Sequence, residues 1–278
     1  MSTDLTTRPA PARAAPAAGV RRRGRKALSS GLLLPVGTII AALALWELVA
    51  SIGLGEFVQY ISSPSGAASA AWSMIESGEL WPSVRVSVVA FAIGFGISCA
   101  IGIPLGLAMG WNRTLREFLE PPMMAFYVMP RLALLPVIVV WLGIGVKATV
   151  VVVVIDAIFP VIINGMAGIR DADAKLVQVA RSFGARKLDL FRKVLLPAST
   201  PAVITGIRLA VARGIMGVIV AQLYVSTIGI GHLISQYGGT YQTDYVVVLV
   251  LLVAIFGYVV NVALQRVERR FETWRGGA

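Results

Sequence analysis

Long stretches of the chain contain no charged residue, and this constrains its fold more than any other feature. Neither Val86–Asn112 nor Tyr245–Gln265 contains Asp, Glu, Lys or Arg. A helix needs about 20 mostly apolar residues to cross about 30 Å of hydrocarbon. Only 14% of the residues are charged and 57% are hydrophobic, whereas soluble domains carry about 25% charged residues. The surrounding solvent must therefore largely be lipid.

The apolar runs predict an all-α membrane protein, because lipid permits only helices or closed barrels and these runs are too long and continuous for barrel strands. Six spans are expected, near residues 32–52, 86–110, 122–142, 148–168, 199–223 and 245–264. They lie within one transmembrane domain, residues 31–265, which is followed by a carboxyl-terminal cytoplasmic tail, residues 266–278.

The amino-terminal segment, residues 1–30, is rich in Ala, Pro, Ser and Arg and predicts a disordered, basic cytoplasmic tail. A basic segment before an apolar run is also typical of a secretory signal. The uncharged run Ala27–Trp46 is longer than the core of about 7 to 15 residues that such signals carry. A retained first membrane helix is the favoured interpretation.

The positions of the basic residues predict the orientation, because Lys and Arg accumulate in cytoplasmic loops. With the amino terminus inside, most of the 25 Lys and Arg residues fall on the cytoplasmic side, and the outer loops keep only Arg85 and Lys147. Both termini are therefore expected in the cytoplasm of a multi-pass protein of the bacterial inner membrane. The net charge of +11 is explained by topology, so no nucleic-acid partner is expected.

Metal and disulfide chemistry are not expected. The chain has one cysteine, Cys99, and one histidine, His232. A disulfide framework or a Cys/His metal cluster needs several such residues.

The longest predicted cytoplasmic loop, residues 169–197, has the pattern of a helix, a turn and a second helix. Asp171 can cap the first helix, Asp173 adds negative charge in its first turn, and Gly184 can end it in a left-handed conformation. The apolar residues at helical spacing on it are Leu176, Ala180 and Phe183.

The second helix of this loop is also amphipathic, with Leu188, Phe191 and Leu195 on one side. Pro197 is expected to stop it before the fifth span. The pattern alone fits either a rigid projecting element or an interfacial segment that anchors the loop to anionic lipid.

The same loop resembles the cytoplasmic signature of binding-protein-dependent ABC importer permeases, which reads E-A-A, three residues, G, nine residues, I, one residue, L-P. The matching positions are Gln178, Val179, Ala180, Gly184, Val194, Leu196 and Pro197. Gln178 and Val179 depart from the signature, which has Glu and Ala there. A contact that needs a carboxylate at position 178 is therefore in question.

Three further segments resemble the nitrate, sulfonate and taurine branch of these permeases: Met129–Gly145, the segment that begins at Phe159, and Gly229–Ile234. The residue that corresponds to Gln222 is often Glu in that family. The resemblance implies the type I ABC importer permease fold.

The resemblance also implies an assembly. Two permease chains, expected to be identical, would form the pathway, two cytoplasmic ABC ATPase subunits would grip the signature loops, and an extracytoplasmic solute-binding protein would deliver substrate. The chain has no G-x-x-x-x-G-K-[ST] sequence, so it cannot cradle nucleotide phosphates itself. ATP and Mg are expected in the partner ATPase, with no cofactor and no catalytic residue on this chain.

Polar residues inside the spans are candidates for the pathway, because a charge in the bilayer must face protein or water. The candidates are Arg131, Asp156, Asn164 and Gln222. With Arg208 and Arg213, three arginines oppose one acid and favour an anionic solute. The structural alternative is that Asp156 pairs with an arginine of the fifth span.

Two other classes of protein compete with this interpretation. An ion-coupled secondary transporter would need acids within its spans, and only Asp156 and Glu47 could serve. A membrane scaffold has no positive support. The sequence leaves the solute open among nitrate, sulfonates, taurine, aromatic carboxylates and pyrimidines.

Overall fold

The computed structural model describes residues 27–52 and 61–272, and it describes side chains for residues 37–52 and 61–266. The chain divides into two compact units at Leu48. The first unit contributes most of α1 (Ala27–Ile52), an apolar helix. Most of the predicted amino-terminal tail lies outside the described residues, and residues 27–30 form the start of α1.

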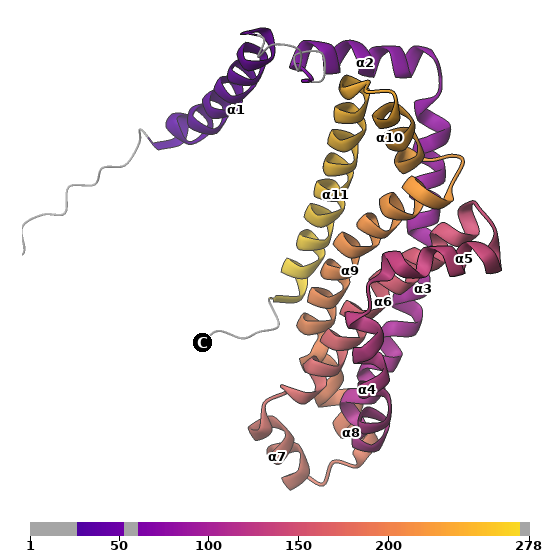
Figure 1. The fold of residues 1–278 in the computed structure, drawn as a ribbon. Helices are drawn as coiled ribbons and strands as arrows, with labels where there is room; N and C mark the ends of the chain where they lie inside the picture. The colour runs from indigo at the N-terminus through magenta and orange to yellow at the C-terminus, as the bar shows by residue number, and fades with distance from the viewer. Residues whose placement is uncertain (1–26, 53–60, 273–278) are drawn as a thin grey trace, which may run out of the picture. The chain divides into compact units, whose positions relative to one another are not determined.

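The second unit holds every later helix, and all regular structure among its described residues is helical. Figure 1 shows α3, α6, α9 and α11 along the length of this unit, with α2 and α10 at one end and α7 and α8 at the other. The elements are α2 (Pro64–Glu76), α3 (Leu80–Trp111), α4 (Arg113–Val128), η2 (Arg131–Leu134), α5 (Leu135–Leu142), α6 (Val146–Arg170), α7 (Ala174–Ser182), α8 (Lys187–Leu190), η3 (Phe191–Leu195), α9 (Leu196–Val225), α10 (Ile230–Gly239) and α11 (Thr243–Glu272).

The core is α6, which makes its most extensive contacts with α3 on one side and α9 on the other. Glycines let these backbones approach closely, as is typical of helix contacts in membranes. A Cβ atom on Gly106 of α3 would lie 2.5 Å from the carbonyl oxygen of Ile162, and one on Gly206 of α9 would lie 2.9 Å from that of Pro160. α3 and α9 also touch each other, at Phe91 and Val218, so the three helices form one tightly packed group.

The predicted third span is not one continuous helix. α4 ends at Val128, and the following η2 and α5 leave at an angle of 91°. Pro130 explains the break, because a proline lacks an N–H and disfavours the helical conformation in the residue before it. That residue, Met129, has a ψ of 135°. Residues 113–121, which lie between the second and third predicted spans, belong to α4.

Four helices are long and apolar enough to cross a membrane, or up to five if the bent pair is one span, within the residues that the structure describes. They are α3, the helix Lys187–Val225, α6 and the Thr243–Arg266 part of α11. The part of α1 whose side chains are described, Gly37–Ile52, is apolar but shorter than these four helices. The structure thus confirms a multi-pass helical membrane protein, while the count of six spans stays a prediction.

The end of the unit that carries α2 and α10 is tied together by polar contacts. The Ser63 hydroxyl caps α2 by accepting from the Gly66 N–H at 2.9 Å. The hydroxyl of Tyr237 on α10 donates to Glu79 at 2.7 Å, next to the start of α3. Burial and the neighbouring Glu79 carboxylate raise the pKa of Tyr237 to about 12, so this hydroxyl stays protonated and able to donate at neutral pH.

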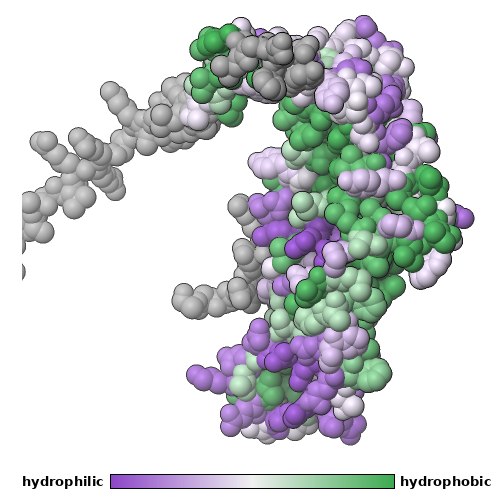
Figure 2. All heavy atoms as spheres, viewed as in Figure 1, coloured by the Kyte–Doolittle hydropathy of each residue, from purple (hydrophilic) through white to green (hydrophobic). Residues whose placement is uncertain are grey.

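The opposite end is polar. Figure 2 shows hydrophilic side chains gathered where α7 and α8 lie, and a broad apolar surface along the bundle above them. The helical unit thus has an apolar middle and a polar end. This distribution is expected of a protein whose middle lies in lipid and whose end lies in water.

The packing of α3 against α6 makes a direct prediction. Gly106→Leu places a side chain against the Ile162 backbone, and overpacking of this kind costs about 1–3 kcal/mol or more. Gly96→Leu is the matched control, because no atom lies within 4 Å of a Cβ at Gly96. We expect Gly106→Leu to abolish or strongly reduce the monodisperse peak in detergent size-exclusion chromatography while Gly96→Leu preserves it. Equal yields of both variants would contradict the packing.

Candidate functional site

The first candidate site is α7, whose two ends are fixed by local hydrogen bonds. Asp173, not Asp171, is the N-cap, and its carboxylate accepts from the Lys175 N–H at 2.8 Å. Asp171 instead follows the end of α6. At the other end Gly184 has a φ of +77°, the left-handed conformation that glycine adopts readily, and the Ala185 N–H donates to the carbonyl oxygen of Ala180 at 3.1 Å. Gly184 therefore ends α7 as predicted.

The apolar residues of α7 lie on two faces. Val177 and Ala180 pack inward against the cluster of buried residues Leu107, Ile169, Leu190 and Leu195. Leu176, Val179 and Phe183 point outward, and they are 53%, 53% and 88% exposed. The predicted stripe of Leu176, Ala180 and Phe183 is thus wrong at Ala180, because Val179 takes its place on the outer face. Gln178 is exposed as well.

The second half of the signature connects α7 to the fifth predicted span. Val194 packs against the same buried cluster, while Leu196 and Pro197 are exposed. Phe191 also packs, with its ring 5.3 Å from that of Trp111, but Leu188 is 58% exposed and does not share the buried side. The predicted second helix is therefore correct in place and only partly correct in its buried face.

Pro197 does not separate this helix from the fifth span. The chain is one helix from Lys187 to Val225, and the turn just before Pro197, Phe191–Leu195, is a π-helix. A proline inside an α-helix removes one hydrogen bond and clashes with the carbonyl four residues earlier. A wider π turn accommodates this without ending the helix.

The second candidate site is a cavity of about 420 Å³ beside the break in the third predicted span. Arg131 Nη1 donates to Asp156 Oδ1 at 2.8 Å, and the two side chains are 19% and 13% exposed. Arg131 also donates to the Tyr127 carbonyl at 3.3 Å and lies 5.7 Å from the centre of its ring. Asp156 therefore pairs with Arg131, not with an arginine of the fifth span.

The cavity carries an excess of positive charge. Arg213 of α9 lines it together with Arg131 and Asp156, and it is exposed. Gly217 makes room for the acid, because a Cβ there would lie 2.8 Å from an Asp156 oxygen. Sequence reasoning missed Tyr127 and Gly217, which no charge pattern marks.

The other two predicted pathway residues lie elsewhere. Asn164 donates to the Pro160 carbonyl at 2.8 Å on its own helix and faces Gly206 of α9. Gln222 is fully buried, and its Oε1 accepts from the Ser87 hydroxyl at 2.7 Å. The structure brings together Arg131 and Asp156 and leaves Asn164 and Gln222 in helix contacts.

No group of three or more His, Cys, Asp and Glu side chains that could hold a metal ion occurs in the part of the chain that the structure describes. The two candidate sites are an exposed apolar face at α7 and a charged cavity at Arg131.

Comparisons with known proteins identify the chain. Residues 102–273 match the family model described as "Binding-protein-dependent transport system inner membrane component". The putative aliphatic sulfonates transport permease protein SsuC of Escherichia coli is 35% identical over 87% of this chain and 90% of its own length. The protein of the same name in Bacillus subtilis is 30% identical over 93% of each chain. The taurine transport system permease protein TauC of Escherichia coli is 27% identical over 92% of this chain and 94% of its own.

Solved structures show the same fold. A chain of the MetNI methionine ABC transporter in an inward-facing conformation aligns with a TM-score of 0.57 at 23% identity, and the match covers 72% of this chain and 96% of that one. A second crystal form of MetNI gives the same TM-score. The chain therefore belongs to the family of binding-protein-dependent inner-membrane transport components, which are non-catalytic permease subunits of ABC transporters.

Proposed function

We propose that this chain forms the translocation pathway of an ATP-driven importer and couples to a separate ATPase through α7. The observation that carries the proposal is the outer face of α7, where Leu176, Val179 and Phe183 are exposed on a helix fixed at both ends. Such an apolar face in the polar, water-facing part of the molecule is typical of a protein interface. Two of its residues, Val179 and Phe183, lie within the segment Gln178–Pro197 that resembles the family signature.

A rigid helix is needed for this coupling, because a flexible loop would absorb the motion of the ATPase. The inner face of α7 is held by Val177 and Ala180 in the cluster that also contains Ile169 of α6 and Leu195, next to α9. A push on α7 would therefore reach the two central helices of the bundle. This arrangement favours coupling over a segment that merely lies on lipid.

The proposed topology has six spans with both termini in the cytoplasm. The support is the distribution of Lys and Arg, with only Arg85 and Lys147 in the predicted outer loops. α7, with the basic residues Lys175 and Arg181, then faces the cytoplasm, where ATP is available. α2 and α10 lie at the opposite end and face outward.

The proposed assembly contains a second permease chain, identical to this one, a dimer of ABC ATPases that binds ATP and Mg, and a solute-binding protein at the outer face. The family description itself names dependence on a binding protein. The cavity at Arg131 opens on the surface of this single chain, and a second copy would enclose it. No cofactor on this chain is part of the proposal.

The proposed solute is a small anion of the sulfonate type. Arg131 and Arg213 line the cavity with only Asp156 to balance them. Relatives that share 27% to 35% of its residues are named for aliphatic sulfonates and taurine, which carry a sulfonate group. An excess of guanidinium groups suits such a group, because Arg binds oxyanions through paired N–H donors.

The alternative of an ion-coupled secondary transporter has less support. Such a transporter needs an acid that can gain and lose a proton during the cycle. Asp156 is held by Arg131 at 2.8 Å, and a partner this close leaves the carboxylate less free to bind a coupling ion. Uptake by vesicles containing this chain alone would nevertheless revive that alternative.

The docking face makes one prediction. Phe183→Ala removes the most exposed apolar side chain of this face, at the C-cap of α7, and losing an interface anchor costs about 2 kcal/mol or more. Phe126→Ala, on α4, is the matched control, because this side chain is also exposed. We expect at least tenfold less ATPase to co-purify with Phe183→Ala and an unchanged amount with Phe126→Ala. Undiminished co-purification with Phe183→Ala would contradict the docking role.

The cavity makes a second prediction. Arg213→Gln removes one of its positive charges, so uptake of ethanesulfonate by proteoliposomes containing the complete importer should fall about tenfold. Arg213→Lys should give an intermediate rate, because it keeps the charge and loses the paired donors. Arg113→Gln is the control, since Arg113 is 82% exposed in a surface pair with Glu117. Uptake that is equal in Arg213→Gln and Arg113→Gln would show that the cavity charge does not serve the solute.

A further inference from the structure

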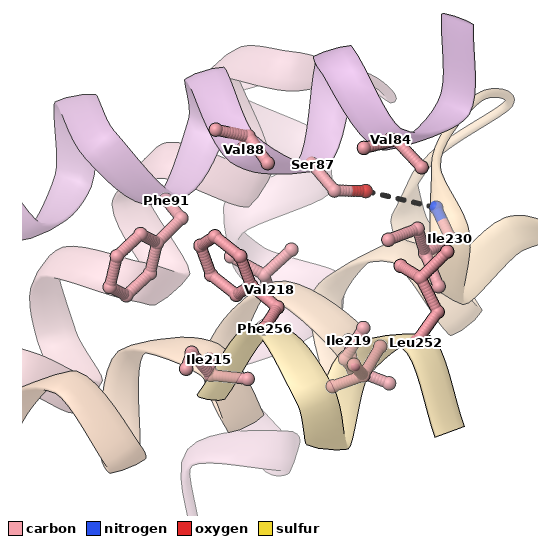
Figure 3. Close-up of a pocket in the computed structure, with 11 residues that line it drawn as sticks. Val84, Ser87, Val88, Phe91, Ile215, Val218, Ile219, Ile230, Leu252 and Phe256 are labelled. Atoms are coloured by element: carbon pink, nitrogen blue, oxygen red, sulfur yellow. Dashed lines mark hydrogen bonds between the residues drawn. The ribbon is translucent and has the colours of Figure 1, made fainter. Parts of the chain in front are cut away.

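The amino-terminal end of α10 is capped by side chains from two other helices. Its own N-cap residue, Gly229, has no side chain to offer. Instead the Ile230 N–H donates to the Ser87 hydroxyl of α3 at 2.9 Å (Figure 3), and the Gly231 N–H donates to Gln222 Oε1 of α9 at 3.2 Å. Ser87 and Gln222 are themselves joined at 2.7 Å. These two side chains replace the local cap that a helix normally carries.

The fit around this trans cap is tight. Ser87 is 4% exposed and Gln222 is fully buried. A Cβ on Gly229 would lie 2.4 Å from the amide carbon of Gln222, and one on Gly231 would lie 2.7 Å from its Cβ. The loop before α10 can therefore sit against Gln222 only because both positions are glycine.

The trans cap is nevertheless only half satisfied. Gln222 Nε2 is buried and has no hydrogen-bond partner among the described residues, so the amide works as an acceptor and its donors are unused. A buried donor without a partner offsets part of what the other hydrogen bonds contribute. A small apolar cavity of about 40 Å³ is lined by Ser87 and Ile230 among others (Figure 3). With a cavity on the Ser87 side and an unused donor on Gln222, opening the trans cap costs less than opening a fully satisfied one.

Gln222 also stands on the helix that begins in the cytoplasmic signature. The helix from Lys187 to Val225 is continuous, and Leu196 of the signature lies about 40 Å from Gln222 along it, at 1.5 Å per residue. A displacement of α9 at its cytoplasmic end moves Gln222 at the other end, while Ser87 belongs to α3. Relative motion of α9 and α3 at this end of the bundle therefore separates Gln222 from Ser87.

We propose that Ser87 and Gln222 form a latch that holds α10 closed over the outer end of the bundle and that opens when α9 is displaced. Both are positioning residues, and the solute touches neither. The inference rests on the proposed function in one respect, because a docked ATPase supplies the displacement. The inner face of α10 that the latch protects includes Leu233, which is 3% exposed and packs with Met74 and Leu249.

The test measures how readily this inner face becomes accessible. Leu233→Cys is introduced with Cys99→Ser, so that position 233 carries the only thiol, and a membrane-impermeant maleimide is added to membranes containing the complete importer. Gln222→Met keeps the volume and removes the acceptor, whereas Gln222→Glu keeps the acceptor. Ser98→Ala is the matched control, because Ser98 is a buried serine of α3 that bonds only to the Gly94 and Val154 carbonyls. Size-exclusion chromatography of each variant confirms that it is folded.

The latch predicts that Gln222→Met and Ser87→Ala raise the labelling rate about tenfold, which corresponds to about 1.4 kcal/mol, and that Gln222→Glu and Ser98→Ala stay within about twofold. Trapping with ATP and vanadate should raise the labelling rate of the Leu233→Cys protein that retains Ser87 and Gln222. Its rate should then reach that of Gln222→Met. Labelling that stays within about twofold in both Gln222→Met and Ser87→Ala would show that packing alone holds α10 and would overturn the proposal.

Labelling that does not respond to nucleotide would also overturn the latch, because the cap would then be static. Failure of the proposed function is distinguishable from both outcomes, since no ATPase would then co-purify with the chain.

Discussion

The close contact of α6 with α3 and α9 is the constraint on which the rest of the structure depends. Lipid is as apolar as the helix surfaces, so the hydrophobic effect cannot drive these helices together, and close van der Waals contact must do so. Gly106 and Gly206 bring two backbones against α6 where a side chain would collide with a carbonyl oxygen. The same close approach on α9 leaves room for Asp156 at Gly217. Glycines on α9 therefore allow both the close packing against α6 and the position of Asp156 in the charged cavity.

The three helices α3, α6 and α9 form a frame that connects the two ends of the helical unit. At one end, α7 is clamped to the frame by Val177 and Ala180. At the other end, α10 is capped by Ser87 and Gln222, one from each of two frame helices. Because the helix from Lys187 to Val225 is unbroken, a force on the signature region acts on both the cavity and the cap. An importer needs this kind of long-range mechanical connection, and a scaffold does not.

Sequence reasoning found the features that depend on composition and local spacing. Uncharged runs located the long helices, and the spacing from Gln178 to Gly184 located α7 and its glycine end. It missed features that depend on tertiary contacts. The partner of Asp156, the role of Gln222 as a cap and the choice of Val179 over Ala180 for the exposed face are set by neighbouring helices. The bend after Met129 had a signal in Pro130, but a proline in an apolar run is also compatible with a continuous helix.

The central claim is that a separate ATPase grips the exposed face of α7 and moves the bundle. Its most direct measurement is photo-cross-linking from a benzophenone amino acid at position 183 in intact membranes, with the attached partner identified by mass spectrometry. The account predicts that the label attaches to the ATPase subunit and that the yield changes when ATP and vanadate are added. Attachment only to lipid, or to a protein on the outer face, would contradict it.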